Sequence, residues 1–187
     1  MDAQYKRKKR ADACEPYVRP TKARIRQAMF NVLRHSFGVD FAGACVLDGF
    51  AGTGALGFDA ASLGARHITF VEKDRYVAGL IRDSAKRRGV PCYVFCCDFA
   101  DFHAPRGFDV VFLDPPYCQG LVIPAMLNLR DAGAITNSVV CIECANRELM
   151  GIHLQLIELG VVKADGDASF VYKTYGHIGV AFYRLHE

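Results

Sequence analysis

The sequence predicts an α/β protein with a doubly wound, mostly parallel sheet of seven strands. Short apolar runs alternate with amphipathic helical stretches between residues 45 and 144, which is the pattern of a parallel sheet covered on both faces. Two further strand-like runs around Gly176 look like a closing strand pair. No internal repeat, low-complexity linker or second domain interrupts the pattern, so residues 19–187 are predicted to form a single domain.

A helix is expected to open this domain. Arg19-Pro20-Thr21 has the character of a helix entry, with Thr21 as the N-cap. Apolar residues then recur at helical spacing to about residue 35. The residues before this entry, 1–18, show no periodicity and are predicted to form an irregular basic arm.

The remaining elements follow from apolar runs and from the glycines that end them. Strands are expected at 45–47, 67–71, 90–96, 108–113, 138–144, 169–175 and 178–185. Helices are expected at 55–63, 75–88 and 121–129. The pattern over 152–165 does not favour either structure.

The composition is that of a globular protein of 187 residues, with 51% hydrophobic and 23% charged residues. No apolar run reaches the roughly 18–20 residues of a membrane-spanning helix. The basic amino terminus is not followed by the apolar segment of a secretory signal. We therefore expect a cytoplasmic monomer that does not contact a membrane.

The eight cysteines are expected to be reduced in that compartment. Cys141-x-x-Cys144 matches half of a zinc site, but no second pair completes it. Alternation along a strand would also place these two thiols on opposite faces of the sheet. We expect small core side chains here and no metal.

The net charge of +3 conceals an asymmetry, because residues 1–26 hold nine of the 23 Lys and Arg but three of the 20 Asp and Glu. A basic arm on a slightly acidic body indicates a polyanionic partner. A solvated tail that only aids solubility is the alternative. The basic residues taken as candidate contacts are Lys6, Arg7, Lys8, Lys9, Arg10, Arg19 and Arg24.

The run Asp114-Pro115-Pro116-Tyr117 follows a buried strand and is the centre of the predicted site. Neither proline has an N–H for the sheet, so the chain must turn at the carboxyl edge of the strand. Open α/β sheets bind their ligands at that edge. A carboxylate acceptor and an aromatic face there suit a flat base that carries an exocyclic amine.

Three other strand ends carry residues suited to a nucleotide. The first strand runs into a glycine turn in which Gly52, Gly54 and Gly57 fit G-x-G-x-x-G, a weak signal when taken alone. Glu72 ends the second strand, where a carboxylate can accept both ribose hydroxyls. Asp98 and Phe99 follow the third strand and are placed to meet an adenine. A glycine loop, a ribose acid and an adenine-edge acid on three successive strand ends predict a nucleotide site more specifically than any one of these features does.

These residues resemble the RsmD-type methyltransferases, which use S-adenosyl-L-methionine to modify a guanine N2 in 16S ribosomal RNA. The shared pieces, spread over about residues 19–184, are Arg19-Pro20-Thr21-x-x-Arg24, Asp48-x-Phe50-Ala51-Gly52-Thr53-Gly54-x-Leu56-Gly57, Glu72, Asp114-Pro115-Pro116-Tyr117-x-x-Gly120-Leu121, Glu143 and Tyr175-Gly176. The resemblance implies a Rossmann-like class I fold whose last strand is antiparallel. It also implies ribosomal RNA or an assembling small subunit as the partner.

The resemblance assigns roles to the matching residues. Asp48 and the loop Phe50-Ala51-Gly52-Thr53-Gly54 would hold the amino-acid part of the cofactor. Glu72 would bind its ribose, and Asp98 with Phe99 its adenine. Asp114 and the Pro115 carbonyl would accept from the target amine, Pro116 would stiffen the turn, and Tyr117 would stack on the base. Arg19, Thr21 and Arg24 would contact the RNA.

Three other functions remain open from the residues alone. An adenine-N6 DNA methyltransferase shares the chemistry, although the chain has no separate target-recognition domain. A nicotinamide-dependent oxidoreductase would account for the glycines and Glu72 but not for Asp114 to Tyr117. A non-catalytic RNA-binding protein would be expected to lose the glycines or Asp114, and both are present.

Overall fold

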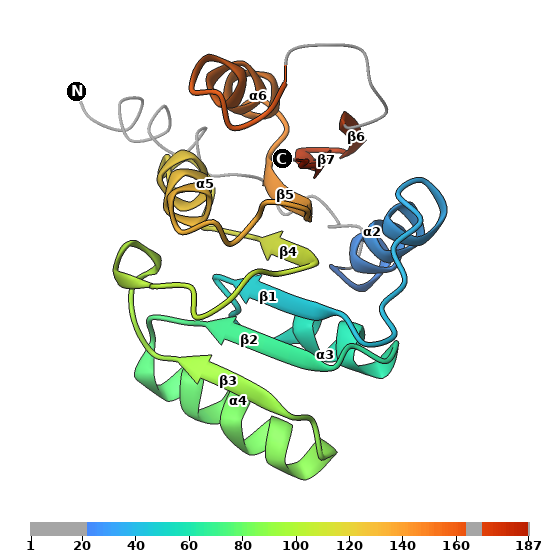
Figure 1. The fold of residues 1–187 in the computed structure, drawn as a ribbon, viewed down its shortest axis with the longest axis vertical. Coiled ribbons are helices and arrows are strands. Elements are labelled where there is room, and N and C mark those ends of the chain that lie inside the picture. The colour runs from blue at the N-terminus through green and yellow to red at the C-terminus, as the bar shows by residue number, and fades with distance from the viewer. Residues whose placement is uncertain (1–21, 164–169, 187) are drawn as a thin grey trace, which may run out of the picture.

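The computed structural model describes residues 22–163 and 170–186, and it confirms the predicted fold (Figure 1). Its seven strands form one sheet in the order β3-β2-β1-β4-β5-β7-β6. Strands β1 to β5 pair in parallel, whereas β7 lies antiparallel to both β5 and β6. The sheet is therefore mostly parallel, with the last strand antiparallel, as the sequence and the family resemblance led us to expect.

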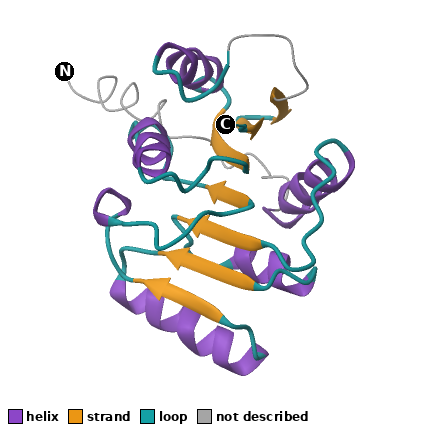
Figure 2. Cartoon of the chain, viewed as in Figure 1, coloured by secondary structure: helices purple, strands orange, loops and turns teal. Residues whose placement is uncertain are grey.

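The strands and helices alternate along the chain until the last two strands (Figure 2). In chain order they are α2 (Lys22–His35), β1 (Cys45–Gly49), α3 (Ala55–Ser62), β2 (His67–Val71), α4 (Arg75–Arg88), β3 (Cys92–Phe95), η1 (Phe99–Asp101), β4 (Val110–Leu113), α5 (Val122–Asp131), β5 (Val139–Ala145), α6 (Leu149–Glu158), β6 (Phe170–Tyr175) and β7 (Ile178–Arg184).

Most predicted elements are confirmed, and α4 shows why the ends of a helix could be predicted from the sequence. Asp74 caps the helix by accepting hydrogen bonds from the amides of Tyr76 and Val77. Gly89 ends it in the left-handed conformation, with φ of 66°. The helix α6 lies partly in the stretch that the pattern left unassigned. Thr21, the predicted N-cap of α2, and the arm 1–18 lie outside the described residues.

Two hydrophobic cores cover the two faces of the sheet. Helices α2, α3 and α4 pack on one face through side chains such as Met29, Phe58 and Ile81. Helices α5 and α6 pack on the other through side chains such as Met126 and Leu156. Alternation along a strand divides its residues between these cores. Every described strand between the two layers therefore has little freedom to shift.

Cys141 and Cys144 illustrate this division. Cys141 belongs to the core under α2 to α4, and Cys144 belongs to the core under α5 and α6. The prediction that the two thiols lie on opposite faces is confirmed. Among the residues in 22–163 and 170–186, no three His, Cys, Asp or Glu side chains gather to hold a metal ion. In the same residues, no helix is both long and apolar enough to cross a membrane.

The strand register aligns four polar or aromatic residues at the carboxyl edge of the sheet. Four residues of neighbouring strands pair in turn across the sheet, namely Val71, Gly49 and Leu113, which end β2, β1 and β4, and Ile142, which lies within β5. The residue that follows each of them therefore comes at the same level. These following residues are Glu72, Phe50, Asp114 and Glu143, and they form the row from which the candidate site is built.

Candidate active site

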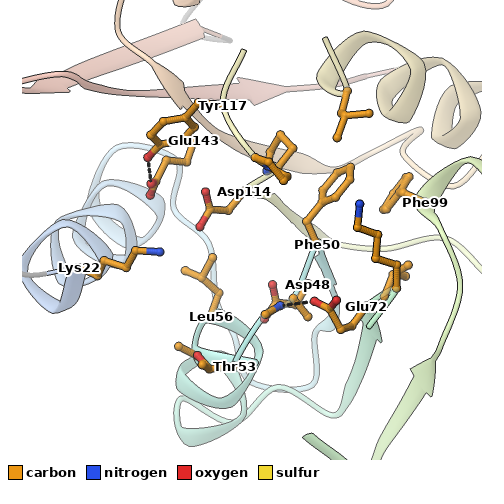
Figure 3. Close-up of a pocket in the computed structure, with 18 of the residues that line it drawn as sticks. Lys22, Asp48, Phe50, Thr53, Leu56, Glu72, Phe99, Asp114, Tyr117 and Glu143 are labelled. Carbon is orange, nitrogen blue, oxygen red and sulfur yellow. Dashed lines mark hydrogen bonds between the residues drawn. The ribbon is translucent and has the colours of Figure 1, made fainter. Parts of the chain in front are cut away.

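A cavity of about 540 Å³ opens at this edge of the sheet (Figure 3). Its wall includes nearly all the residues that the sequence predicted to bind a cofactor or a base. They are Asp48, Phe50, Ala51, Gly52, Thr53, Glu72, Asp98, Phe99, Asp114, Pro115, Pro116 and Tyr117. The structure thus brings four separate strand ends together around one space, which no single motif could establish.

The glycine loop between β1 and α3 is held in an unusual backbone conformation. Phe50, Gly52 and Gly54 all have positive φ angles, of 63°, 53° and 73°. Gly54 lies at the N-cap of α3 and not on the cavity wall, and a Cβ there would come within 2.9 Å of Phe58. At Gly52 a Cβ would meet no atom within 4 Å, so the space beside its backbone is open to a ligand.

Asp48 is a buried carboxylate at the base of this loop, only 2% exposed. Its Oδ2 accepts a 2.8 Å hydrogen bond from the Gly57 amide in the first turn of α3. The pKa of Asp48 is raised from 3.8 to about 8, chiefly by burial; the hydrogen bond from Gly57 lowers it, and the nearby charges of Asp114 and Glu72 add to the rise. A cation bound beside Asp48 would favour its ionised form.

Glu72 is tied to the loop by its carboxylate. Its Oε2 accepts a 2.8 Å hydrogen bond from the Gly52 amide, and its Oε1 accepts one of 2.8 Å from the Asp74 amide. Each carboxylate oxygen still has acceptor capacity for a further donor. The side chain therefore fixes the loop and also faces the cavity, where ribose hydroxyls were predicted (Figure 3).

Two aromatic rings form a flat part of the wall. Phe50 stacks on Phe99 with ring centroids 4.9 Å apart and an interplanar angle of 16°. Close packing requires glycine at position 49, because a Cβ there would come within 2.6 Å of the Phe99 ring. Asp98 also lines the cavity, but its Oδ1 accepts from the Ala100 amide at 3.1 Å and caps the short helix η1.

The turn after β4 presents Asp114 and Tyr117 to the same cavity (Figure 3). Pro115 is buried, and Cys118 after the turn has a positive φ of 59°. The Tyr117 hydroxyl donates a 2.5 Å hydrogen bond to Glu143 Oε1 at the carboxyl end of β5. This bond fixes the outer end of the tyrosine ring over the site.

Four charged lining residues were absent from the predicted site: Lys22, Arg26, Lys73 and Glu143. Glu143 had matched the family pattern, and its signal is the one shared with Asp48, Glu72 and Asp114, an acid in the carboxyl half of an apolar strand or directly after it. Arg26 pairs with Asp59 at 2.5 Å across α2 and α3. Lys22 and Arg26 reach the cavity from α2, a proximity that sequence spacing does not reveal.

Of the residues predicted to contact RNA, only Arg24 lies in the part of the chain that the structure describes. Arg24 lies on α2, where it is exposed and does not line the cavity. Arg19, Thr21 and the basic run 6–10 lie outside the described residues. Their role in RNA binding therefore stays a prediction.

Two known proteins of similar sequence give consistent matches. "Ribosomal RNA small subunit methyltransferase D" of Escherichia coli K12 is 36% identical over 128 residues, 67% of this chain and 63% of that protein. The match thus spans less than two thirds of that relative's length. "Putative rRNA methyltransferase YlbH" of Bacillus subtilis is 30% identical over 175 residues, 89% of this chain and 88% of that protein.

A solved structure supports the same grouping. It is described as "Putative methyltransferase yhhF from Escherichia coli", has a TM-score of 0.66 and 28% identity, and matches 88% of this chain and 87% of its own. A family model described as "Conserved hypothetical protein 95" matches residues 3–174, nearly the whole chain. This chain therefore belongs to the conserved hypothetical protein 95 family, that of the RsmD-type methyltransferases.

Proposed function

We propose that the protein transfers a methyl group from S-adenosylmethionine to the exocyclic N2 amine of a guanine in small-subunit ribosomal RNA. The observation that carries the proposal is the single cavity in which Asp114 and Tyr117 face the glycine loop and Glu72 (Figure 3). Family membership and the names of the relatives support the ribosomal RNA substrate.

The cavity suits the cofactor by charge and by shape. Its wall holds the acids Asp48, Glu72, Asp98, Asp114 and Glu143 against the bases Lys22, Arg26 and Lys73. When bound, S-adenosylmethionine supplies a methyl group already activated on a sulfonium. Asp48 and the open backbone at Gly52 would hold its amino-acid part, because a buried carboxylate stabilises an ammonium group. Glu72 would accept from the ribose hydroxyls, and Asp98 with Phe99 would hold the adenine.

Asp114 and the Pro115 carbonyl would act on the target amine. An aryl amine is a weak nucleophile because its lone pair is delocalised into the ring. Two acceptors on its N–H groups favour a pyramidal nitrogen, and the lone pair then points toward the methyl carbon. Positioning supplies most of the rate in such a reaction, so no strong base is required.

Tyr117 would receive the base after it leaves the RNA stack. A base inside paired RNA cannot reach a site at the edge of a sheet, so it must be extruded or already unpaired. Stacking on an aromatic ring contributes about 1–3 kcal/mol per base. The hydrogen bond to Glu143 holds the Tyr117 ring in place for this contact. The basic arm and Arg24 would meanwhile contact phosphates.

A transfer assay tests the proposal directly. Purified protein and labelled S-adenosylmethionine are incubated with small ribosomal subunits, with free 16S RNA and with double-stranded DNA, all from a strain that lacks the gene. The modified base is then mapped by mass spectrometry. We expect N2-methylguanosine in the ribosomal RNA. Methylation of adenine in the DNA, or of no guanine in either RNA substrate, would contradict the proposal.

A further inference from the structure

Asp114 and Glu143 lie side by side at the carboxyl edge of the sheet. The strands that carry them are parallel neighbours, and Leu113 of β4 pairs with Ile142 of β5. Asp114 and Glu143 come one residue after this pair, on strands about 4.8 Å apart. Residues at the same level of neighbouring strands face the same side. The two carboxylates therefore point into the same part of the cavity (Figure 3).

Glu143 is placed to meet a ligand although it is 8% exposed. Its Oε1 accepts the hydrogen bond from the Tyr117 hydroxyl. A carboxylate has about four acceptor positions, so one hydroxyl leaves capacity for another N–H. Any such donor would have to come from a group that occupies the cavity beside Asp114 and Tyr117, where the target base is proposed to lie.

Lys22 approaches this region from the opposite wall. It begins α2, lines the same cavity and extends toward Asp114 (Figure 3). An ammonium group offers three donors and no acceptor. Around the proposed base position, Asp114 and Glu143 thus each present a hydrogen-bond acceptor, and Lys22 presents a donor.

This pattern complements one nucleobase. The Watson–Crick edge of guanine carries the N2 amine, the N1–H donor and the O6 acceptor in that order. Adenine has an acceptor at N1, and cytosine has one at N3, so both would place a lone pair against a carboxylate. We propose that Glu143 and Lys22 select guanine: Glu143 accepts from N1–H, and Lys22 donates to O6. This inference rests on the function proposed above, and it assigns the specificity of the site to residues other than Asp114.

The experiment changes the edge of the base and keeps the reacting amine. RNA is prepared with guanine or with 2,6-diaminopurine at the nucleotide that the wild-type protein methylates. The second base keeps the N2 amine but has an acceptor at N1 and an amine in place of O6. The measured quantity is kcat/KM for guanine divided by kcat/KM for 2,6-diaminopurine. Misfolding reduces both terms equally, so the ratio reports selectivity alone.

Two variants test the two contacts. Glu143→Gln keeps the shape of the side chain but places an amide donor near N1, and we expect the ratio to fall by about 10- to 100-fold. Lys22→Met removes the donor to O6, and we expect a fall of about tenfold. Tyr117→Phe is the matched control: it removes the hydroxyl bonded to Glu143 and keeps the ring, so the rates change but the ratio should stay within about twofold.

The outcomes separate this inference from the proposed function. Guanine methylation by the wild-type protein with an unchanged ratio in Glu143→Gln and Lys22→Met would overturn the inference and leave the function standing. An equal fall in Tyr117→Phe and Glu143→Gln would mean that Glu143 only positions the tyrosine. Methylation of an adenine or cytosine amine, or no transfer at all, would contradict both.

Discussion

The amide of Gly52 donates a 2.8 Å hydrogen bond to Glu72 Oε2 and joins the glycine loop to the end of β2. The second oxygen of Glu72 holds the Asp74 amide, at the entry to α4. One carboxylate therefore fixes two turns, the glycine loop and the entry to α4. The sequence predicted a ribose acceptor at Glu72, and the structure adds this role in shaping the loop.

Replacing Glu72 with Ala should weaken both the fold and the site. Two backbone amides lose their acceptor, and we expect a loss of about 1–3 kcal/mol in the free energy of unfolding. Affinity for S-adenosylhomocysteine should fall at least tenfold in calorimetry. The control is Asp83→Ala on the exposed surface of α4, which should change neither value. Unchanged affinity in Glu72→Ala would remove Glu72 from the cofactor site.

Asp114→Ala should abolish methyl transfer and leave cofactor binding within about twofold. Asp114 is proposed to hold the target amine, and Glu72 and Asp48 to hold the cofactor. Calorimetry with S-adenosylhomocysteine and single-turnover transfer to RNA measure the two effects separately. If cofactor affinity fell as far as the transfer rate, Asp114 would belong to the cofactor site instead.

The buried Asp48 predicts a pH dependence of stability. Its pKa rises from 3.8 to about 8, first through burial and then through Asp114 and Glu72. Between these values the folded protein holds a proton that the unfolded chain releases, so the free energy of unfolding falls as pH rises. We expect denaturant titrations to show this fall in the wild-type protein, and a shallower one in Asp48→Asn. Equal slopes would show that Asp48 is ionised in the folded protein.

The same residue predicts a pH dependence of cofactor affinity. A cationic amino group bound beside Asp48 favours the ionised carboxylate, so binding should release a proton below about pH 8. S-adenosylhomocysteine should therefore bind more tightly as pH rises from about 6 to about 8. Calorimetry in buffers of different ionisation enthalpy measures the released proton. The release should disappear in Asp48→Asn.

Two helical glycines give a matched test of close packing. A Cβ at Gly57 in α3 would come within 2.3 Å of the Phe70 ring, whereas one at Gly79 in α4 would meet no atom within 4 Å. Gly57→Ala should therefore destabilise the protein by about 1–3 kcal/mol. Gly79→Ala should stabilise it by about 0.5–1 kcal/mol, because alanine favours a helix. Thermal unfolding measures both, and opposite signs are the decisive result.

The basic arm predicts salt-dependent RNA binding. Replacing Lys6, Arg7, Lys8, Lys9 and Arg10 with Gln should weaken binding to 16S RNA and flatten the dependence of affinity on salt, by about 0.7–0.9 in log–log slope for each lost phosphate contact. The control replaces Lys86, Arg87 and Arg88, in the last turn of α4, in the same way. An equal effect from both variants would assign the binding to overall charge and not to the arm.

The sequence predicted the alternating elements well because local signals marked them. Helix α4 has a capping aspartate and a terminal glycine, and both act within a few residues. Helix α6 is followed by a glycine of positive φ, Gly160 (64°), but its start carries no such mark. Apolar side chains lie on both its faces, with Leu156 buried and Leu154 57% exposed, so no periodic contrast appears. No side chain caps its first turn either.

The site was predictable where strand order alone brings residues together. Glu72 and Asp114 directly follow β2 and β4, the two strands that flank β1, and their positions follow from the α/β pattern. Lys22 and Arg26 could not be found this way, because the packing of α2 against the sheet depends on side chains far along the chain. The hydrogen bond between Tyr117 and Glu143 likewise depends on where the turn after β4 places Tyr117 relative to β5.

The common level of Glu72, Phe50, Asp114 and Glu143 limits how the chain can change length. In a strand, losing or gaining one residue turns every later side chain to the opposite face. A single-residue deletion within β1, β2, β4 or β5 would therefore aim its catalytic-edge residue into a hydrophobic core. Insertions are tolerable only where they leave the strands intact, as at the exposed turn around Gly133 between α5 and β5.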